Sequence, residues 1–125
     1  MSIPAVKSVE IGAGIKAAEL PGSKMHDEIV KDLKHTTNNA GGIEGGMSNG
    51  EPIIIKAAMK AIPTMVMPLK SVDLITGEEH QAHVERADVC AVPACAVVAE
   101  AMLANVLANA FLEKFGCDSL KEIKA

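Results

Sequence analysis

The sequence predicts a single domain of the α+β class over residues 1–125, with strands first and one long helix after them. Three observations lead to this class. The length of 125 residues suits one domain. Short segments rich in β-branched residues, bounded by glycine or proline, lie before residue 88. An alanine-rich apolar run follows, from Pro93 to about Phe115.

The first half of the chain contains three expected strands. Residues 3–11 alternate loosely between apolar and polar side chains, and a glycine ends the segment. Residues 15–20 are expected as a second short strand, which a Pro-Gly pair terminates. Residues 23–34 are polar and mixed in charge, which indicates a loop or a short helix. Residues 52–59 are rich in isoleucine and predict the third strand.

The second half contains an expected hairpin and the long helix. Residues 71–74 and 79–85 are expected to pair around a turn at Thr76 and Gly77. Proline is favoured in the first turn of a helix, so the helix is expected to begin at Pro93. The helix is expected to end before Gly116. Its apolar residues lie on more than one face, so the helix is expected to be buried on more than one side. A short amphipathic helix from Asp118 closes the chain.

Composition excludes several classes of protein and partner. The hydrophobic fraction of 49% is too high for a disordered chain. A net charge of −4 argues against a nucleic-acid surface, because phosphate binding needs clustered lysine and arginine. Aromatic residues make up only 2%, so base stacking is largely unavailable as well.

Cysteine usage and the N-terminus indicate a cytoplasmic protein. The three cysteines are an odd number, and no secretory signal precedes them, so free thiols in a reducing compartment are expected. The one long apolar run, residues 89–112, is dominated by alanine and contains Glu100, Asn105 and Asn109. A helix buried in protein is therefore favoured over a membrane span.

The strongest local anomaly is a cluster of glycines. Five of the ten glycines fall within residues 37–50. Such a segment can bring backbone N–H groups close to a phosphate or a planar ring. It lacks the Gly-Lys-Ser/Thr of a P-loop and the βαβ setting of a dinucleotide fingerprint. A tight surface turn explains the glycines equally well, and the pattern alone leaves both interpretations open.

Two further segments are candidates for anion binding. Lys60 and Thr64 lie four residues apart, with Pro63 stiffening the link, and are suited to a phosphate group. Taken alone, a solvated lysine and a turn threonine explain them better. Arg86, the only arginine, lies two residues before Asp88 at the junction between a strand and the long helix. A local ion pair is the simpler explanation there.

No metal site or activated nucleophile is expected. His80 and His83 on a strand would point to opposite faces, and the spacing of Cys90 and Cys95 differs from that of structural zinc sites. None of the cysteines has an evident histidine partner.

Several blocks together resemble the C-terminal third of chorismate synthases, in order and in spacing, over essentially the whole chain. The blocks are residues 1–12, 22–23, 27–29, 39–50, 59–64, 71–73, 85–94 and 98–102. The resemblance implies a layered β-α-β sandwich, usually assembled as a homotetramer. It also implies a reaction, the anti 1,4-elimination of phosphate from 5-enolpyruvylshikimate 3-phosphate to give chorismate, which requires reduced FMN and places the protein in the shikimate pathway.

The resemblance also implies roles for individual residues. The family's FMN contacts correspond to Gly45, to Arg86 and to the run Lys60, Ala61, Ile62, Pro63 and Thr64. Arg86 is expected to serve either the flavin or the anionic substrate. The acid of the family's signature corresponds to Asp88, expected near the flavin N5, where a carboxylate can assist proton transfer. Ala87 departs from the serine or histidine expected between them.

Other parts of the family pattern have no counterpart in this sequence. The Gly-Glu-Ser-His-Gly block, the second catalytic histidine and the basic substrate-binding residues of the N-terminal part are missing, and none of the four histidines lies in an equivalent context. The chain by itself is therefore expected to bind FMN weakly or not at all and to be inactive, and to need self-association or a chain that supplies the N-terminal part. The alternative is a non-catalytic assembly domain derived from the enzyme.

Overall fold

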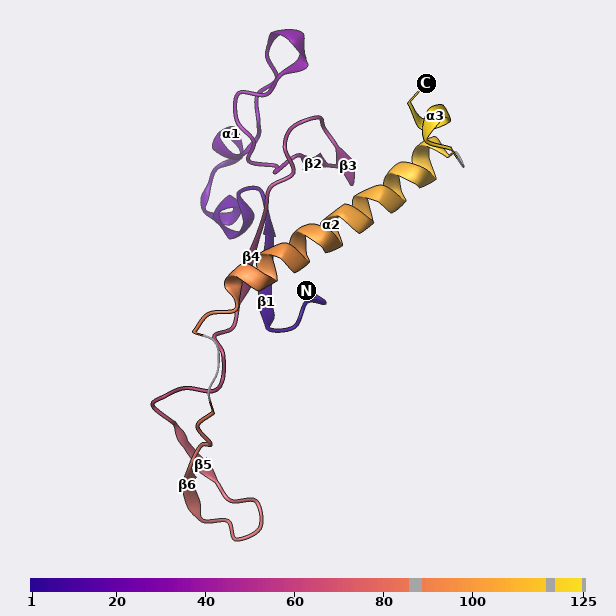
Figure 1. Cartoon of the computed structure of the whole chain (residues 1–125). Helices are drawn as coiled ribbons and strands as arrows, with labels where there is room; N and C mark the ends of the chain where they lie inside the picture. The colour runs from indigo at the N-terminus through magenta and orange to yellow at the C-terminus, as the bar shows by residue number, and fades with distance from the viewer. Residues whose placement is uncertain (86–88, 117–118, 125) are drawn as a thin grey trace. The chain divides into compact units, whose positions relative to one another are not determined.

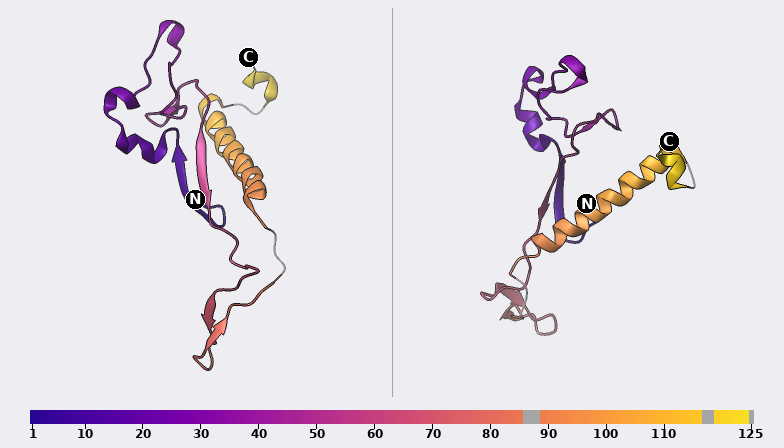
Figure 2. Two further views of the ribbon diagram at one scale, coloured as in Figure 1. Left: turned by 90° about the vertical axis from the view of Figure 1, so that its left-hand side faces the viewer. Right: turned by 45° about the horizontal axis from the view of Figure 1, so that its top comes forward.

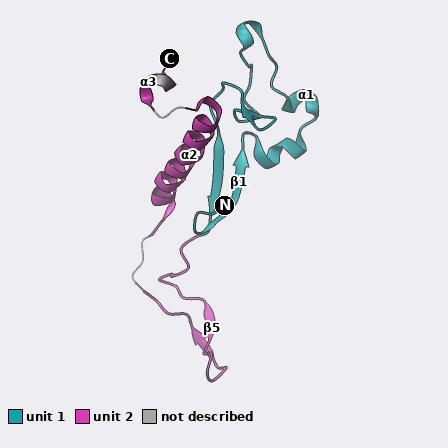
Figure 3. Cartoon of the chain, turned by 90° about the vertical axis from the view of Figure 1, so that its right-hand side faces the viewer, with its two compact units in different colours: residues 1–60 teal, residues 61–125 magenta. Residues whose placement is uncertain are grey.

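The computed structural model describes residues 1–85, 89–116 and 119–124. Contacts divide the chain into two compact units, residues 1–60 and residues 61–125, which Figure 3 distinguishes by colour. The α+β class is confirmed, because short strands precede one long helix. The prediction of a single domain over the whole chain stays a prediction.

The first unit is built on a ribbon of two antiparallel strands, β1 (Val6–Ile11) and β4 (Ile55–Met59), which lie side by side in Figures 1 and 2. Both strands were expected and are confirmed, with later starts than predicted. A bulge interrupts the register after Val6, the one buried apolar side chain among the described residues. Because two strands alone form a marginal sheet, the ribbon depends on the segments around it.

The prediction of a strand over residues 15–20 is wrong. This segment is a 3₁₀ helix, η1 (Gly14–Glu19). Its lysine, alanines and glutamate favour helical backbone over strand. Gly12 has φ +60°, so the chain also turns away from the ribbon before the segment begins. The next segment, as expected, holds short helices, α1 (Gly22–Met25) and the 3₁₀ turn η2 (Lys31–Leu33).

The glycine cluster contains a hairpin that the sequence did not predict. Strands β2 (Ile43–Glu44) and β3 (Met47–Ser48) pair across a two-residue loop, Gly45-Gly46. Both glycines have positive φ, +57° and +78°. These values are typical of a type I′ turn, whose twist matches that of antiparallel strands.

The second unit contains the predicted hairpin, β5 (Lys70–Val72) and β6 (Glu79–Gln81). Strand β5 ends earlier than predicted because Asp73 accepts hydrogen bonds from the N–H groups of Ile75 and Thr76, both 2.8 Å long, and so starts the turn. Strand β6 starts at Glu79 as predicted and ends early, at Gln81. The hydrogen bonds from Thr76 and Ile75 hold the pKa of Asp73 below its ordinary value.

The long helix α2 (Val92–Phe115) begins and ends as predicted, with proline in its first turn and Gly116 after its last residue at φ +59°. A short helix, α3 (Leu120–Ile123), follows. No residue of α2 is buried, contrary to the expectation of a buried helix. By length and composition alone α2 is apolar enough to cross a membrane.

Candidate functional site

Three glycines of the first unit allow backbone segments to approach more closely than any side chain permits. A Cβ added to Gly12 would overlap the carbonyl oxygen of Asn39 and lie 2.5 Å from the amide nitrogen of Gly41. A Cβ added to Gly42 would lie 2.6 Å from the carbonyl oxygen of Pro52. These glycines are buried, so they serve packing of the chain against itself.

The glycines of the β2–β3 turn are different. Gly45 and Gly46 are exposed, and a Cβ at either position would meet nothing within 4 Å. Of the two interpretations of the cluster, a tight surface turn holds for Gly45 and Gly46, which form the exposed turn of the hairpin, whereas Gly41 and Gly42 are buried. The turn at Gly45 leaves its backbone open to a ligand, which keeps the binding interpretation for that position.

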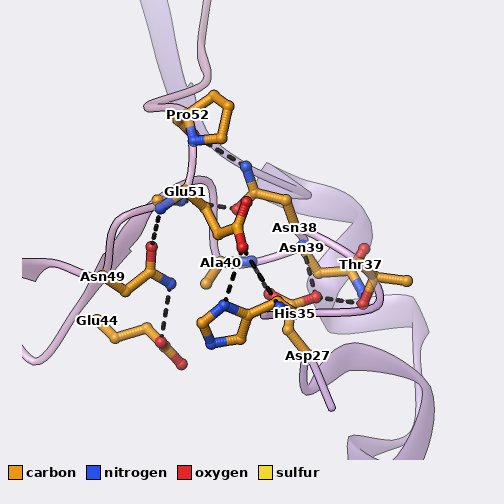
Figure 4. A network of polar contacts seen from close by, with 11 residues as sticks. Asp27, His35, Thr37, Asn38, Asn39, Ala40, Glu44, Asn49, Glu51 and Pro52 are labelled. Carbon is orange, nitrogen blue, oxygen red and sulfur yellow. Dashed lines mark hydrogen bonds and ion pairs between the residues drawn. The ribbon is translucent and has the colours of Figure 1, made fainter. Parts of the chain in front are cut away.

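A polar network holds the start of the glycine-rich segment, as Figure 4 shows. The carboxylate of Asp27 accepts hydrogen bonds from the hydroxyl of Thr37 and from the N–H groups of Asn39 (2.7 Å) and Ala40 (2.8 Å). All three donors lie on a segment that begins ten residues after Asp27. A short carboxylate side chain thus replaces regular secondary structure as the partner of these backbone groups.

The end of the glycine-rich segment, at Glu51 and Pro52, is hydrogen-bonded to residues near its start. The side-chain amide of Asn38 donates to the carbonyl oxygen of Pro52 (2.9 Å), and its oxygen accepts from the N–H of Gly42 (2.9 Å). Glu51 accepts a hydrogen bond from the N–H of His35 (3.3 Å) and lies 3.2 Å from its ring Nδ1. These contacts hold the two ends of the glycine-rich segment next to each other, and the β2–β3 hairpin lies between the two ends in sequence.

Acidification is expected to release the Asp27 anchor. Partial burial acts to raise the pKa of Asp27, but hydrogen bonds from Ala40, Thr37 and Asn39, together with nearby His35, outweigh it and hold this pKa below its ordinary value of 3.8. A depressed pKa means that the stabilisation is complete above the ordinary value and is lost as the pH falls through the lower, folded value. The amide chemical shifts of Asn39 and Ala40, followed against pH, should therefore change below 3.8. A midpoint above 3.8 would contradict this assignment.

The second unit contains a cavity of about 330 Å³ beside the predicted FMN segment. Ala61, Ile62 and Thr64 lie on one part of its wall, and Glu85 and Val89 lie on another. The last two residues flank Arg86 and Asp88 in sequence. The volume falls at the lower end of the range for small-molecule sites, and the lining is mostly apolar, with Thr64 and Glu85 as its polar residues. Two predicted segments thus border one cavity.

The remaining predicted site residues have other positions. Lys60 follows β4 and is exposed, and no ion pair among the described residues involves it. Pro63 is exposed and does not line the cavity. Arg86 and Asp88, predicted to be catalytic, lie outside the described residues.

The histidines of the β5–β6 region have local partners. The ring Nδ1 of His80 lies 2.6 Å from the carbonyl oxygen of Gln81, and Nε2 of His83 lies 3.3 Å from a carboxylate oxygen of Glu85. Within the described ranges, no three His, Cys, Asp or Glu side chains are grouped as a metal site requires.

Sequence reasoning did not identify Asp27 or Asn38. Asparagine is frequent in turns, where its side chain hydrogen-bonds to nearby backbone, and this preference could have indicated Asn38. No local signal indicates Asp27, because its partners follow ten or more residues later and become neighbours only in the folded chain.

Comparison with known proteins gives one consistent result. A model of the chorismate synthase family matches residues 1–112. The chorismate synthases of Pelobacter propionicus and Geobacter metallireducens are each 58% identical over 99% of this chain, and that of Moorella thermoacetica is 57% identical over 99%. A crystal structure of chorismate synthase matches 99% of the chain with a TM-score of 0.77 and 45% identity. This chain spans about a third of the length of these relatives, 34% of the first two.

Proposed function

The chain belongs to the chorismate synthase family, and we propose that it forms the C-terminal part of an enzyme that uses reduced FMN to convert 5-enolpyruvylshikimate 3-phosphate into chorismate and phosphate. The enzyme class is a carbon-oxygen lyase of the shikimate pathway, as the names of the relatives imply. The alternative, a non-catalytic assembly domain, is not favoured by these similarities.

One observation carries the proposal. The cavity of the second unit brings Ala61, Ile62 and Thr64 together with Glu85 and Val89. These groups come from the two segments whose residues resemble the family's FMN and catalytic positions. Two distant segments that share a family signature and border one cavity support a binding site, whereas a drifting structural domain has no need to keep both.

The residues present fit a flavin phosphate and ring. An apolar wall suits an uncharged ring system, and the Thr64 hydroxyl is a donor for a phosphate oxygen. The ammonium group of Lys60 adds a positive charge four residues earlier, free of any described ion pair. Gly45 offers an exposed backbone with no side chain in the way. Reduced FMN, when bound, supplies electron density to the substrate as phosphate leaves.

The protein's own residues bind anions and move a proton. Lys60 and Thr64 hold phosphate, and the planar guanidinium of Arg86 binds phosphate or carboxylate oxygens in two places at once. Asp88 contributes a carboxylate oxygen that takes up and passes on a proton.

Flavin binding is the direct test. We expect FMN fluorescence to be quenched weakly by the chain alone, and strongly when a chain supplying the N-terminal part is present. Lys60→Ala and Arg86→Ala should each weaken FMN binding about 10- to 100-fold, because a hydrogen bond to a charged group contributes about 1.5–3 kcal/mol.

Lys70→Ala is the matched control for charge. Lys70 is exposed, and among the described residues its one ion pair is with Glu79 across the β5–β6 hairpin, so its removal should leave FMN binding unchanged. FMN quenching that survives both Lys60→Ala and Arg86→Ala would contradict the assignment of the phosphate site.

We propose further that the protein acts in the cytoplasm and assembles with other chains, as a homotetramer or with a chain that supplies the N-terminal part. Cys90 and Cys95 are free thiols, which suits a reducing compartment. The apolar surface of α2 supports association with protein. The net charge of −4 gives no support to a nucleic-acid partner.

A further inference from the structure

Few interactions within the β2–β3 hairpin stabilise it. Each strand has two residues, and neither strand contains a buried residue. Outside the strand pairing, the hairpin is closed by a hydrogen bond from the Asn49 side chain to Glu44 (2.9 Å) and by one from the Asn49 N–H to the carbonyl oxygen of Gly42 (3.0 Å). Two paired strands alone are marginal in water. The position of the Gly45-Gly46 turn must therefore be set where the hairpin joins the unit.

That junction is held by Asn38, whose side-chain oxygen accepts from the N–H of Gly42 (2.9 Å). Just before Gly42 in the chain, the carboxylate of Asp27 fixes the N–H groups of Asn39 and Ala40. The carbonyl oxygen of Asn39 in turn accepts from the N–H of Ala13 (2.7 Å). The next two residues, Gly41 and Gly42, are buried and lead directly into β2.

The contact with Asp27 needs an anion. An ionised carboxylate only accepts hydrogen bonds, and all three groups that approach Asp27 are donors. An asparagine at this position has nearly the same shape, but its NH₂ group would face an N–H or hydroxyl donor. At least one of the three contacts would be lost, and a donor left without its partner carries a penalty.

We propose that Asp27 is a positioning residue for the flavin: its carboxylate holds Asn39 and Ala40 so that the Gly45-Gly46 turn is presented in one orientation to the cofactor. The proposal rests on the proposed function for its ligand. Asp27 itself acts through the loop and touches no ligand. Without the anchor, the turn samples many orientations and only a fraction is competent to bind, so the apparent affinity falls by that fraction.

Backbone NMR order parameters in the full chain test the positioning without any flavin. Asp27→Asn should lower the order parameters of Gly45 and Gly46 from about 0.8 to below about 0.6, and leave those of β1 and β4 unchanged. Asp32→Asn is the matched control, since Asp32 lies five residues away, is exposed and makes no described side-chain hydrogen bond. Asp27→Glu, which keeps the charge, should restore much of the order.

Two results would overturn the proposal. The first is an Asp27→Asn protein whose Gly45-Gly46 turn stays ordered. The second is a loss of order that extends to β1 and β4, including failure to fold, because Asp27 would then maintain the whole unit. Thr37→Val, which removes only the hydroxyl that orients the carboxylate, should give a smaller loss at the same turn if the proposal is right and no loss if it is wrong.

FMN titration separates this inference from the proposed function. Asp27→Asn should weaken FMN binding about tenfold while Asp32→Asn does not. Equal FMN affinity in the wild-type protein and in Asp27→Asn would overturn the role of Asp27. Absence of FMN binding in every protein, with the N-terminal chain present, would count against the proposed function, and the order parameters alone would then decide the role of Asp27.

Discussion

Replacing Gly12 by alanine is expected to destabilise the first unit by about 4 kcal/mol or more, near the upper end for single substitutions. Two effects add. The residue has φ +60°, which costs an L-residue about 1–2 kcal/mol. The new Cβ would also overlap the backbone of Asn39 and lie 2.5 Å from the nitrogen of Gly41, and backbone atoms have little freedom to move away.

Gly45→Ala separates the two effects. Gly45 has nearly the same φ, +57°, but a Cβ there would meet nothing within 4 Å. It should therefore lose only the conformational cost of about 1–2 kcal/mol. The measurement is hydrogen exchange at the amides of β1 and β4, which gives the free energy of opening for this unit. Equal losses in the two variants would show that close backbone contact contributes nothing.

The second large effect is expected on turnover. Asp88→Asn should lower the rate of phosphate release from 5-enolpyruvylshikimate 3-phosphate about 10²- to 10⁴-fold, the usual contribution of a positioned acid or base. The asparagine cannot take up a proton. FMN binding should change by less than about twofold, because the proposal gives the phosphate to Lys60, Thr64 and Arg86.

The assay uses reduced FMN and the assembly that is active, with the chain supplying the N-terminal part. Asp32→Asn, an exposed aspartate far along the sequence, is the control and should retain full turnover. Normal phosphate release by Asp88→Asn would remove this residue from the mechanism. A parallel loss of FMN binding would instead make it a binding residue.

Local signals were sufficient for the main elements of the fold. Loose alternation of apolar and polar residues predicted β1, and a run of isoleucines predicted β4. Proline and Gly116 bounded α2 to within a residue or two. Each of these signals depends on residues adjacent in sequence. The conformation of each of these segments is determined by its own residues: the side chains of a strand, the proline that starts a helix and the glycine that ends it.

The errors arose where distant residues decide the conformation. The segment of η1 has an isoleucine that suggests a strand, but the turn at Gly12 and the close approach of Asn39 and Gly41 direct the chain elsewhere. The β2–β3 hairpin was missed because its strands are too short to show any alternation. Asp27 was missed because its partners follow ten or more residues later.

The candidate site shows the same division. Two pairs of residues had a simpler explanation than ligand binding when each was taken alone, because such pairs are common on protein surfaces. These pairs are Lys60 with Thr64 and Arg86 with Asp88. The order and spacing of several blocks together led to the family, which the comparisons then established. The structure added what no spacing shows, that Ala61, Ile62 and Thr64 border one cavity with Glu85 and Val89.

The pairing of β1 with β4 has a consequence for synthesis of the protein. About 45 residues separate the paired strands, so β1 leaves the ribosome well before its partner exists. At a translation rate of about 5–20 residues per second, roughly 2–9 s pass between the synthesis of β1 and that of β4. During that time Val9 and Ile11 lie on a strand with two open edges, a form of chain that chaperones bind and that pairs with other strands. The speed of translation between the two strands is therefore expected to influence how much of the protein reaches its folded state.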